Sequence, residues 1–244
     1  NGNNYINEAI NNGARIIVSN LRYEGFNKHK ILFIRSKDPR KLLAESASNF
    51  YYKKPKNIIA VTGTNGKTSI ANFYYQILSL NKAKVAAIGT LGVLSKKYNL
   101  KTKNTSIDPV NIHKILQKIK ELKIDNVILE ASSHGLKQNR LNNINFNTAL
   151  FTNLTRDHLD YHKTFKDYLN SKLILFNKLL KNKGNIVFDE KISQSKQLTN
   201  IAKKRNLKKY NFGNQKSFIR ILNIQKLDDF KRVDFKMSNK KYSF

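Results

Sequence analysis

The sequence predicts an α/β fold, with a mostly parallel sheet covered by helices on both faces. From Ile58 onward, apolar segments of strand length alternate with segments of helical period. Such alternation is typical of parallel sheets, because the chain usually crosses back over the sheet as a helix. In these sheets, ligands bind at the carboxyl ends of the strands. We therefore expect the functional residues where apolar strands give way to polar segments.

The composition is that of a globular protein. Of the 244 residues, 40% are hydrophobic and 10% aromatic, and no apolar stretch is long enough to cross a bilayer. The absence of cysteine excludes disulfides and thiolate metal sites, and it is compatible with a cytoplasmic location. No signal-peptide pattern opens the chain.

The net charge of +30 raises nucleic acid as a partner. Most of the excess is lysine, however, and it is spread along the whole chain together with abundant asparagine. A specific nucleic-acid surface more often shows clustered arginines and interleaved aromatic residues. Nucleic-acid binding is therefore the less favoured interpretation.

Residues 1–56 are predicted to form part of a smaller α/β unit. "YINEAINNGA" predicts a short helix, and "RIIVSN" and "ILFIRS" predict strands. "DPRKLLAESASNFYYKK" predicts a helix with Asp38 as its N-cap and Pro39 at its first position. The stretch "KKPKN" (53–57) is the best candidate for a domain boundary, because a proline in a basic segment follows a completed helix.

Residues 57–244 are predicted to form the main domain. The first strand leads to a helix with an apolar face of Ile70, Phe73, Tyr74, Ile77 and Leu78. The later strands are "KVAAIGT", "NVILEA", "NTALFTN" and "NIVFDE", with helices from Asp108-Pro109 and from about Thr164 to Asn182. The tail from Ser217 predicts two or three antiparallel strands.

The segment "IIAVTGTNGKTSI" (58–70) has the features of a phosphate-binding loop between a strand and a helix. Gly63 and Gly66 allow a close backbone approach, Lys67 would reach the terminal phosphates, and Thr68 would bind Mg²⁺. The spacing is shorter than in G-x-x-x-x-G-K-[ST], because Val61 stands where the first glycine would be. The alternative is an ordinary strand–helix turn that contains Gly-Lys by chance.

Three further polar residues stand out. Glu130 ends the apolar strand "NVILE", where its carboxylate could bind Mg²⁺ beside a nucleotide, although a lone glutamate at a strand end is usually solvated. His158 follows the strand "ALFTN"; taken alone, a single histidine there is more often a hydrogen-bonded structural residue. Lys172 falls within an apolar helical stripe, so it either extends its ammonium to the solvent or is chemically altered.

Four motifs in one order resemble the Mur ligases. They are "VTGTNGKTS", "LEASSHGLKQNRL", "FTNLTRDHLDYH" and "SKLILF". The resemblance is densest over residues 57–177, and it is closest to the UDP-N-acetylmuramoyl-tripeptide synthetase branch, which adds the third amino acid of the peptidoglycan stem peptide. This family uses G-T-N-G-K-[ST], so the short spacing counts in favour of the resemblance.

The resemblance implies an ATP-dependent, ADP-forming carboxylate–amine ligase that works through an acyl phosphate. Its substrates would be UDP-N-acetylmuramoyl-L-alanyl-D-glutamate and a diamino acid, either meso-diaminopimelate or L-lysine. The implied catalytic residues are Lys67, His158 and Lys172, and the implied Mg²⁺ ligands are Thr68, Glu130, His158 and Lys172 (if carbamylated). ATP would bind to Gly63, Thr64, Asn65, Gly66, Lys67, Thr68 and Ser69. The muramoyl peptide would bind to Asn104, Thr105, Ser106, Ser132, Gln138 and Arg140.

The same resemblance implies a domain division. Residues 1–56 would be the C-terminal part of a UDP-binding domain, and residues 57–244 the central ATP-binding domain, truncated at its end. A C-terminal domain that binds the amino acid would be absent, so the fragment alone is expected to be inactive. The alternatives are a folylpolyglutamate synthetase-like ligase, a basic phosphate-loop protein that binds nucleic acid, and a non-catalytic nucleotide-binding remnant.

Overall fold

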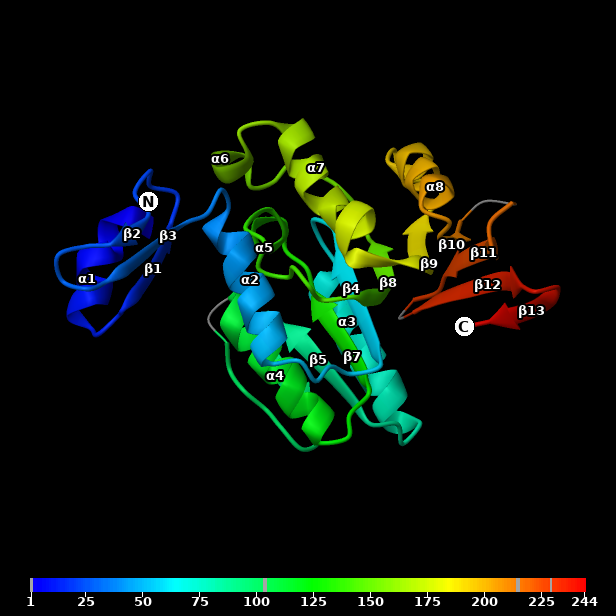
Figure 1. Cartoon of the computed structure of the whole chain (residues 1–244). Coiled ribbons are helices and arrows are strands. Elements are labelled where there is room, and N and C mark those ends of the chain that lie inside the picture. The colour runs from blue at the N-terminus through cyan, green and yellow to red at the C-terminus, as the bar shows by residue number, and fades with distance from the viewer. Residues whose placement is uncertain (1, 103–104, 214–215, 229) are drawn as a thin grey trace.

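The computed structural model describes residues 2–102, 105–213, 216–228 and 230–244. Within these ranges, the strands form two separate sheets, one of three strands and one of ten. Figure 1 shows the small sheet at the N-terminal side, joined to the larger layer by the helix α2 (Pro39–Phe50). No helix in the described ranges is both long and apolar enough to span a membrane.

The small sheet has its third strand in the centre. That strand is parallel to the first and antiparallel to the second. The side chain of Ile17 is buried, whereas its neighbours Ile16 and Val18 are exposed, so this sheet has one open face. The elements of the unit are η1 (Gly2–Tyr5), α1 (Ile6–Asn11), β1 (Ile16–Ser19), β2 (Gly25–Phe26) and β3 (Leu32–Arg35).

The helix α2 begins as the sequence predicts. The carboxylate of Asp38 accepts a hydrogen bond from the Lys41 amide at 3.0 Å, and Pro39 occupies the first turn. The cap satisfies one of the amides that have no partner within the helix, and proline has no amide to satisfy. α2 then packs on α4 (Pro109–Glu121), which connects the small unit to the main layer.

The large sheet is parallel in its centre and antiparallel at both edges. In the order in which they pair, its described strands are β13 (Lys240–Ser243), β12 (Lys231–Met237), β11 (Ile219–Lys226), β10 (Lys208–Phe212), β9 (Leu180–Asp189), β8 (Phe146–Phe151), β4 (Asn57–Thr62), β7 (Asn126–Glu130), β5 (Val85–Gly89) and β6 (Gly92–Ser95). From β10 to β5 all neighbours are parallel. β6 is antiparallel to β5, and β11, β12 and β13 form the antiparallel tail that the sequence predicts.

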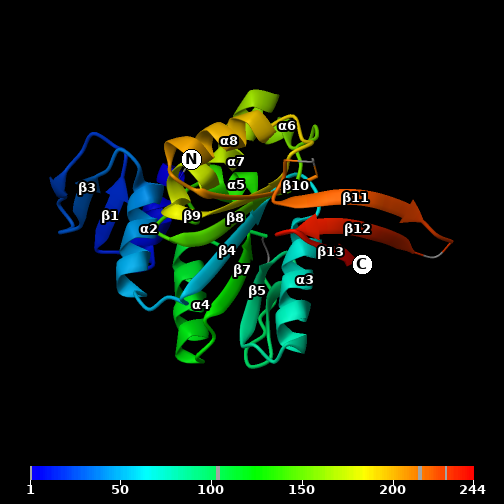
Figure 2. The same ribbon diagram turned by 90° about the vertical axis from the view of Figure 1, so that its right-hand side faces the viewer.

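Helices cover both faces of this sheet, which confirms the predicted fold class. Figure 2 shows α3 and α4 on opposite sides of the layer, while β11 and β12 extend away from it. The apolar stripe of α4 is buried as predicted, with Ile112, Ile115, Leu116 and Ile119 in the main core. The remaining helices are α3 (Lys67–Leu80), α5 (Ser133–Lys137), α6 (Leu159–His162), α7 (Phe165–Ile174) and α8 (Ser195–Lys204).

The predicted apolar face of α3 is partly wrong. The side chains of Phe73 and Ile77 are 59% and 58% exposed. The helix instead packs around Ala71, which is buried against Val61 and Ile128 of the sheet. A small residue at the centre of the contact lets the helix axis approach the sheet closely, so the buried stripe is narrower than the apolar pattern.

The predicted helix over 164–182 ends earlier. α7 continues into one π-helical turn, η2 (Leu175–Leu179), and β9 begins at Leu180. The guanidinium of Arg205 donates hydrogen bonds to the carbonyls of Phe176 at 2.6 Å and Leu180 at 2.7 Å. A cation that satisfies terminal carbonyls stabilises a helix end. This partner is the C-cap residue of α8, distant in sequence, so the local sequence pattern could not reveal the end point.

We expect Arg205→Met to lower the free energy of unfolding by about 1–3 kcal/mol, because buried carbonyls lose a charged donor. Denaturant unfolding followed by circular dichroism measures the change. Arg220→Met, at an exposed position of β11, is the matched control and should leave the midpoint unchanged. Equal midpoints for the two variants would contradict this role for Arg205.

Candidate active site

The phosphate-loop segment is fixed between the ends of two neighbouring strands. Gly63 has a φ of 148°, and a Cβ there would lie 1.8 Å from Oγ1 of Thr152, so only glycine fits. The Thr64 amide donates to the carbonyl of Asn153 at 3.0 Å, and Thr152 Oγ1 donates to the carbonyl of Asn65 at 2.7 Å. The segment after β8 therefore sets the shape of the loop.

The loop leads directly into the N-terminus of α3. Gly66, in a left-handed conformation with a φ of 83°, is the residue before the helix and has no side chain to cap it. The first amides of a helix have no intrahelical acceptor, and they carry the positive end of the helix dipole. This end of α3 is therefore suited to bind phosphate oxygens.

Lys67 folds back over the loop. Its Nζ donates hydrogen bonds to the carbonyls of Gly63 at 3.0 Å and Thr64 at 2.7 Å. Burial lowers the pKa of the Lys67 ammonium, while the carboxylates of Glu130 and Asp157 act in the opposite direction. The ammonium is thus held at the loop, partly desolvated, where an anion would gain most from it.

Glu130 is buried at the end of β7, and each of its carboxylate oxygens has a partner. Oε2 accepts from Oγ1 of Thr68 at 2.9 Å, and Oε1 accepts from the amide of Thr90 at 2.9 Å. A Cβ on Gly89 would lie 2.1 Å from Oε1, so glycine makes room for the carboxylate. Gly89 and Thr90 were not predicted as site residues, although their position at the end of the strand "KVAAIGT" is a usable signal.

Lys172 points inward, and its ammonium does not reach the solvent. The residue is 1% exposed, its Nζ donates to the carbonyl of Gly63 at 2.7 Å, and Nζ lies 4.3 Å from the centroid of the Tyr168 ring. Burial lowers the pKa of the Lys172 ammonium to about 7, and the charge of Lys67 adds to the shift. No carboxylate forms an ion pair with Lys172 among the described residues.

His158 lies at the mouth of the site and is half exposed. Its backbone has a φ of 52°, which is unusual for a residue other than glycine. Its Nε2 lies 3.5 Å from Oδ2 of Asp157, and its ring centroid is 5.0 Å from that of His134. The imidazole is therefore available to a ligand in the pocket.

These side chains meet in one pocket of about 260 Å³ at the carboxyl edge of the parallel strands. Its lining residues are Thr64, Asn65, Gly66, Lys67, Thr68, Ser69, Thr90, Thr105, Glu130, Ser132, Ser133, His158 and Lys172. The hydroxyl of Thr68 and the carboxylate of Glu130 are hard oxygen donors, as Mg²⁺ requires. Among the described residues, no group of three or more His, Asp or Glu could hold a metal alone. An ion here would therefore complete its shell with phosphate and water.

The predicted peptide-binding residues form a hydrogen-bonded wall beside this pocket. Ser132 Oγ donates to Ser106 Oγ at 2.9 Å, and Arg140 Nη1 donates to the Ser106 carbonyl at 2.8 Å. Arg140 Nη2 also donates to Oε1 of Gln138 at 2.7 Å. Thr105 and Ser132 line the pocket itself, whereas Asn104 lies outside the described residues.

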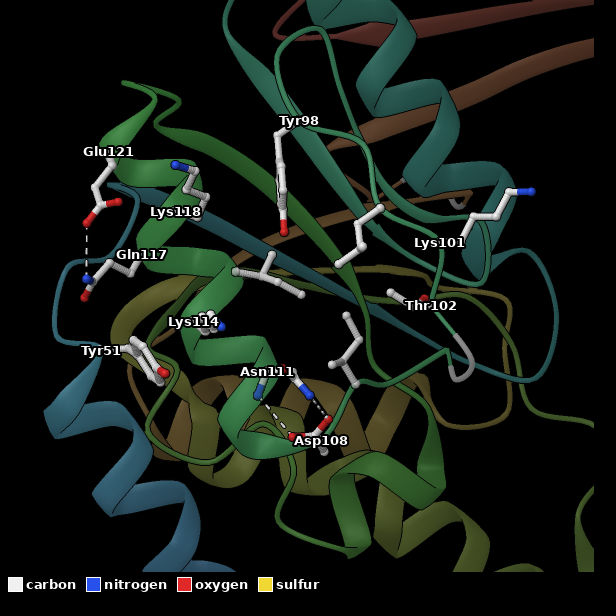
Figure 3. Close-up of a pocket in the computed structure, with 13 residues that line it drawn as sticks. Tyr51, Tyr98, Lys101, Thr102, Asp108, Asn111, Lys114, Gln117, Lys118 and Glu121 are labelled. Atoms are coloured by element: carbon white, nitrogen blue, oxygen red, sulfur yellow. Dashed lines mark hydrogen bonds between the residues drawn. The ribbon is translucent and has the colours of Figure 1, made fainter.

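A larger cavity of about 740 Å³ lies elsewhere, between α4 and the segment 98–102 (Figure 3). Tyr98 and Tyr51 border it, and its rim carries both lysines and the carboxylates of Asp108 and Glu121. None of the phosphate-loop residues lines it. Because lysine is abundant everywhere in this chain, the rim gives no clear preference for an anion. The smaller pocket is therefore the candidate site, despite its size.

Comparisons with known proteins show which family the chain resembles. The model of the Mur ligase middle domain matches residues 61–244. The chain is 38% identical over 214 residues to the UDP-N-acetylmuramoyl-L-alanyl-D-glutamate–2,6-diaminopimelate ligase of Rickettsia bellii, covering 85% of this chain and 44% of the relative. The corresponding ligase of Rickettsia montanensis is 36% identical over 248 residues, covering 100% of this chain and 51% of the relative.

Solved structures give the same assignment of fold. A structure of a UDP-N-acetylmuramoyl-L-alanyl-D-glutamate–2,6-diaminopimelate ligase superimposes with a TM-score of 0.82 at 25% identity, covering 98% of this chain and 49% of that one. An FPGS–AMPPCP complex has a TM-score of 0.63 at 12% identity, covering 84% and 56%, which shows a shared fold alone. The chain spans about half the length of the curated relatives it matches. The matched domain, the similarity in sequence and the shared fold lead to one conclusion: the chain belongs to the Mur ligase family.

Proposed function

We propose that this chain carries the ATP- and Mg²⁺-binding site of an ADP-forming ligase that joins an amine to a carboxylate in peptidoglycan precursor synthesis. The observation that carries the proposal is the meeting of Lys67, Thr68, Glu130 and Lys172 in one pocket. A carboxylate and a triphosphate are both anionic, so cations and aligned amides have to stabilise the charge as they react.

Residues 63–69 would hold the ATP phosphates. The first amides of α3 point toward the loop, and the Lys67 ammonium would exchange the carbonyls of Gly63 and Thr64 for phosphate oxygens. This exchange requires no large movement, because both carbonyls belong to the loop itself. Thr68 and Glu130 would hold Mg²⁺, which supplies charge neutralisation of the phosphates when bound.

Lys172 would serve in its carbamylated form. The lone pair of the neutral Nζ would attack the carbon of CO₂, forming an N–C bond and releasing a proton, so the cation becomes an anion. Support comes from the buried position of Lys172 and from the nearby Lys67, whose charge disfavours a second ammonium. His158 and the modified Lys172 would then hold a second Mg²⁺.

The acceptor would bind along the wall of Thr105, Ser106, Ser132, Gln138 and Arg140, to which the sequence resemblance adds Asn104. We assign it as UDP-N-acetylmuramoyl-L-alanyl-D-glutamate, after the relatives that carry this name. Those names also favour diaminopimelate over lysine as the incoming amine. The folylpolyglutamate synthetase alternative has only fold similarity in its support. Only the net charge of the chain supports a nucleic-acid partner.

Two further assignments belong to this proposal. Residues 1–56 would be part of the UDP-binding domain and residues 57–244 the central domain, in agreement with the two separate sheets. The reaction would take place in the cytoplasm, where ATP and nucleotide-linked sugars are available.

The nucleotide site can be tested by calorimetric titration of the chain with MgATP. Lys67→Ala should weaken binding about tenfold to a hundredfold, because a desolvated charged hydrogen bond contributes about 1.5–3 kcal/mol. Lys82→Ala removes an exposed lysine just beyond the far end of α3 and is the matched control. An unchanged affinity of Lys67→Ala would remove the phosphate-loop assignment.

Carbamylation can be tested by ¹³C NMR of the chain equilibrated with ¹³C-labelled bicarbonate. We expect one slowly exchanging carbamate signal that Lys172→Ala abolishes and that Lys178→Ala, at an exposed position, retains. In a ligase that also contains the amino-acid-binding domain, a short carboxylic acid should partly restore the activity lost in Lys172→Ala, because it replaces the missing carboxylate. A wild-type spectrum without this signal would contradict the proposed role of Lys172.

A further inference from the structure

His162 lies outside the pocket, but it contacts α5 and α7, two of the helices beside the pocket. It ends α6 and is 0% exposed. It has no part in the proposed chemistry, and it is not among the pocket-lining residues. A fully buried histidine with polar partners on several elements calls for a physical explanation.

Both ring nitrogens of His162 have partners. Nε2 lies 2.9 Å from Oγ of Ser133, which follows the pocket residue Ser132 at the start of α5. Nδ1 lies 3.4 Å from Oγ of Ser171, the residue before Lys172 in α7. One imidazole thus bridges α5, which has Ser132 and Gln138 as its caps, and α7, which carries the buried lysine.

The surrounding hydrogen bonds determine which nitrogen carries the proton. The hydroxyl of Ser171 donates to the carbonyl of Asp167 at 2.8 Å, so its oxygen is left to accept from Nδ1–H. Oδ2 of Asp167 lies 3.6 Å from Nδ1 and favours the same tautomer. Nε2 is then the acceptor of the Ser133 hydroxyl. Burial lowers the pKa of His162, which favours the neutral ring that this arrangement requires.

The His162 ring also contacts Tyr168, which connects it to the phosphate loop. The centroids of the His162 and Tyr168 rings are 5.1 Å apart. The Tyr168 hydroxyl lies 3.2 Å from Oγ1 of Thr64 in the phosphate loop, and the Tyr168 ring lies beneath the Lys172 ammonium. A displacement of His162 would therefore affect the loop and the lysine together.

We propose that His162 is a positioning residue, which aligns Lys172, the phosphate loop and the start of α5 as one rigid unit. This role rests on the proposed function, because it concerns the same site. His162 does not line the pocket. It acts through Ser133, Ser171 and Tyr168.

The test uses the whole chain with two readouts, the MgATP affinity and the fraction of Lys172 that carries the ¹³C carbamate. His162→Phe keeps the ring and removes both hydrogen bonds, and we expect each readout to fall about tenfold, as misplaced functional groups do. His162→Gln offers an amide oxygen to Ser133 and should recover part of both losses. His29→Phe changes an exposed histidine in the small unit and should leave both readouts unchanged.

The outcomes are separable from those of the proposed function. Circular dichroism first establishes that each variant is folded. A His162→Phe chain that is less stable but has normal affinity and normal carbamate would overturn the positioning role and leave a structural one. If the wild-type chain binds MgATP but carries no carbamate, the carbamate assignment of Lys172 fails. The MgATP affinity of His162→Phe then decides alone whether His162 is a positioning residue. A wild-type chain that binds no MgATP removes the proposed function and this role together.

Discussion

Two lysine ammonium groups share one carbonyl oxygen, that of Gly63. Lys67 approaches it from the helix that follows the loop, at 3.0 Å, and Lys172 approaches it from α7, at 2.7 Å. Both are partly or fully removed from water, so their mutual repulsion is poorly screened. A neutral carbonyl is a weak partner for two cations. The structure thus concentrates positive charge at one point and leaves a pocket beside it for negative charge.

The topology of the sheet places the other groups around this point. In the parallel register, Val61 of β4 lies opposite Glu130 of β7, and Thr62 lies opposite Phe151 of β8. The three strands therefore end together, which brings the loop, the carboxylate and the segment that holds Gly63 to the same edge. Parallel strands with crossover connections make such a meeting of distant residues routine.

Features that depend on neighbouring residues in the sequence could be predicted, and features that depend on contacts with distant elements could not. The loop glycines, the strand-end Glu130 and the inward position of Lys172 were predictable, because each depends on a local period or a local turn. His162 was not, because its role depends on contacts with α5 and α7, which a local pattern does not specify. Thr90 has a local signal in its place at a strand end, but its hydrogen bond to Glu130 depends on the pairing of β5 with β7. The exposed Phe73 and the early end of α7 have the same origin: Ala71 and Arg205 decide them through contacts with other elements.

The charge of the pocket links the modification of Lys172 to the metal requirement. As an ammonium, Lys172 makes the neighbourhood of Gly63 strongly positive, and a metal cation would be repelled. As a carbamate, it would reverse its sign, and the change equals the charge of one divalent ion. Lys67 would then have an anionic neighbour in place of a cationic one, so its own ammonium would be stabilised for phosphate binding. On this argument, the carbamate and the metal ion favour each other, and each alone would leave uncompensated charge in a poorly solvated site.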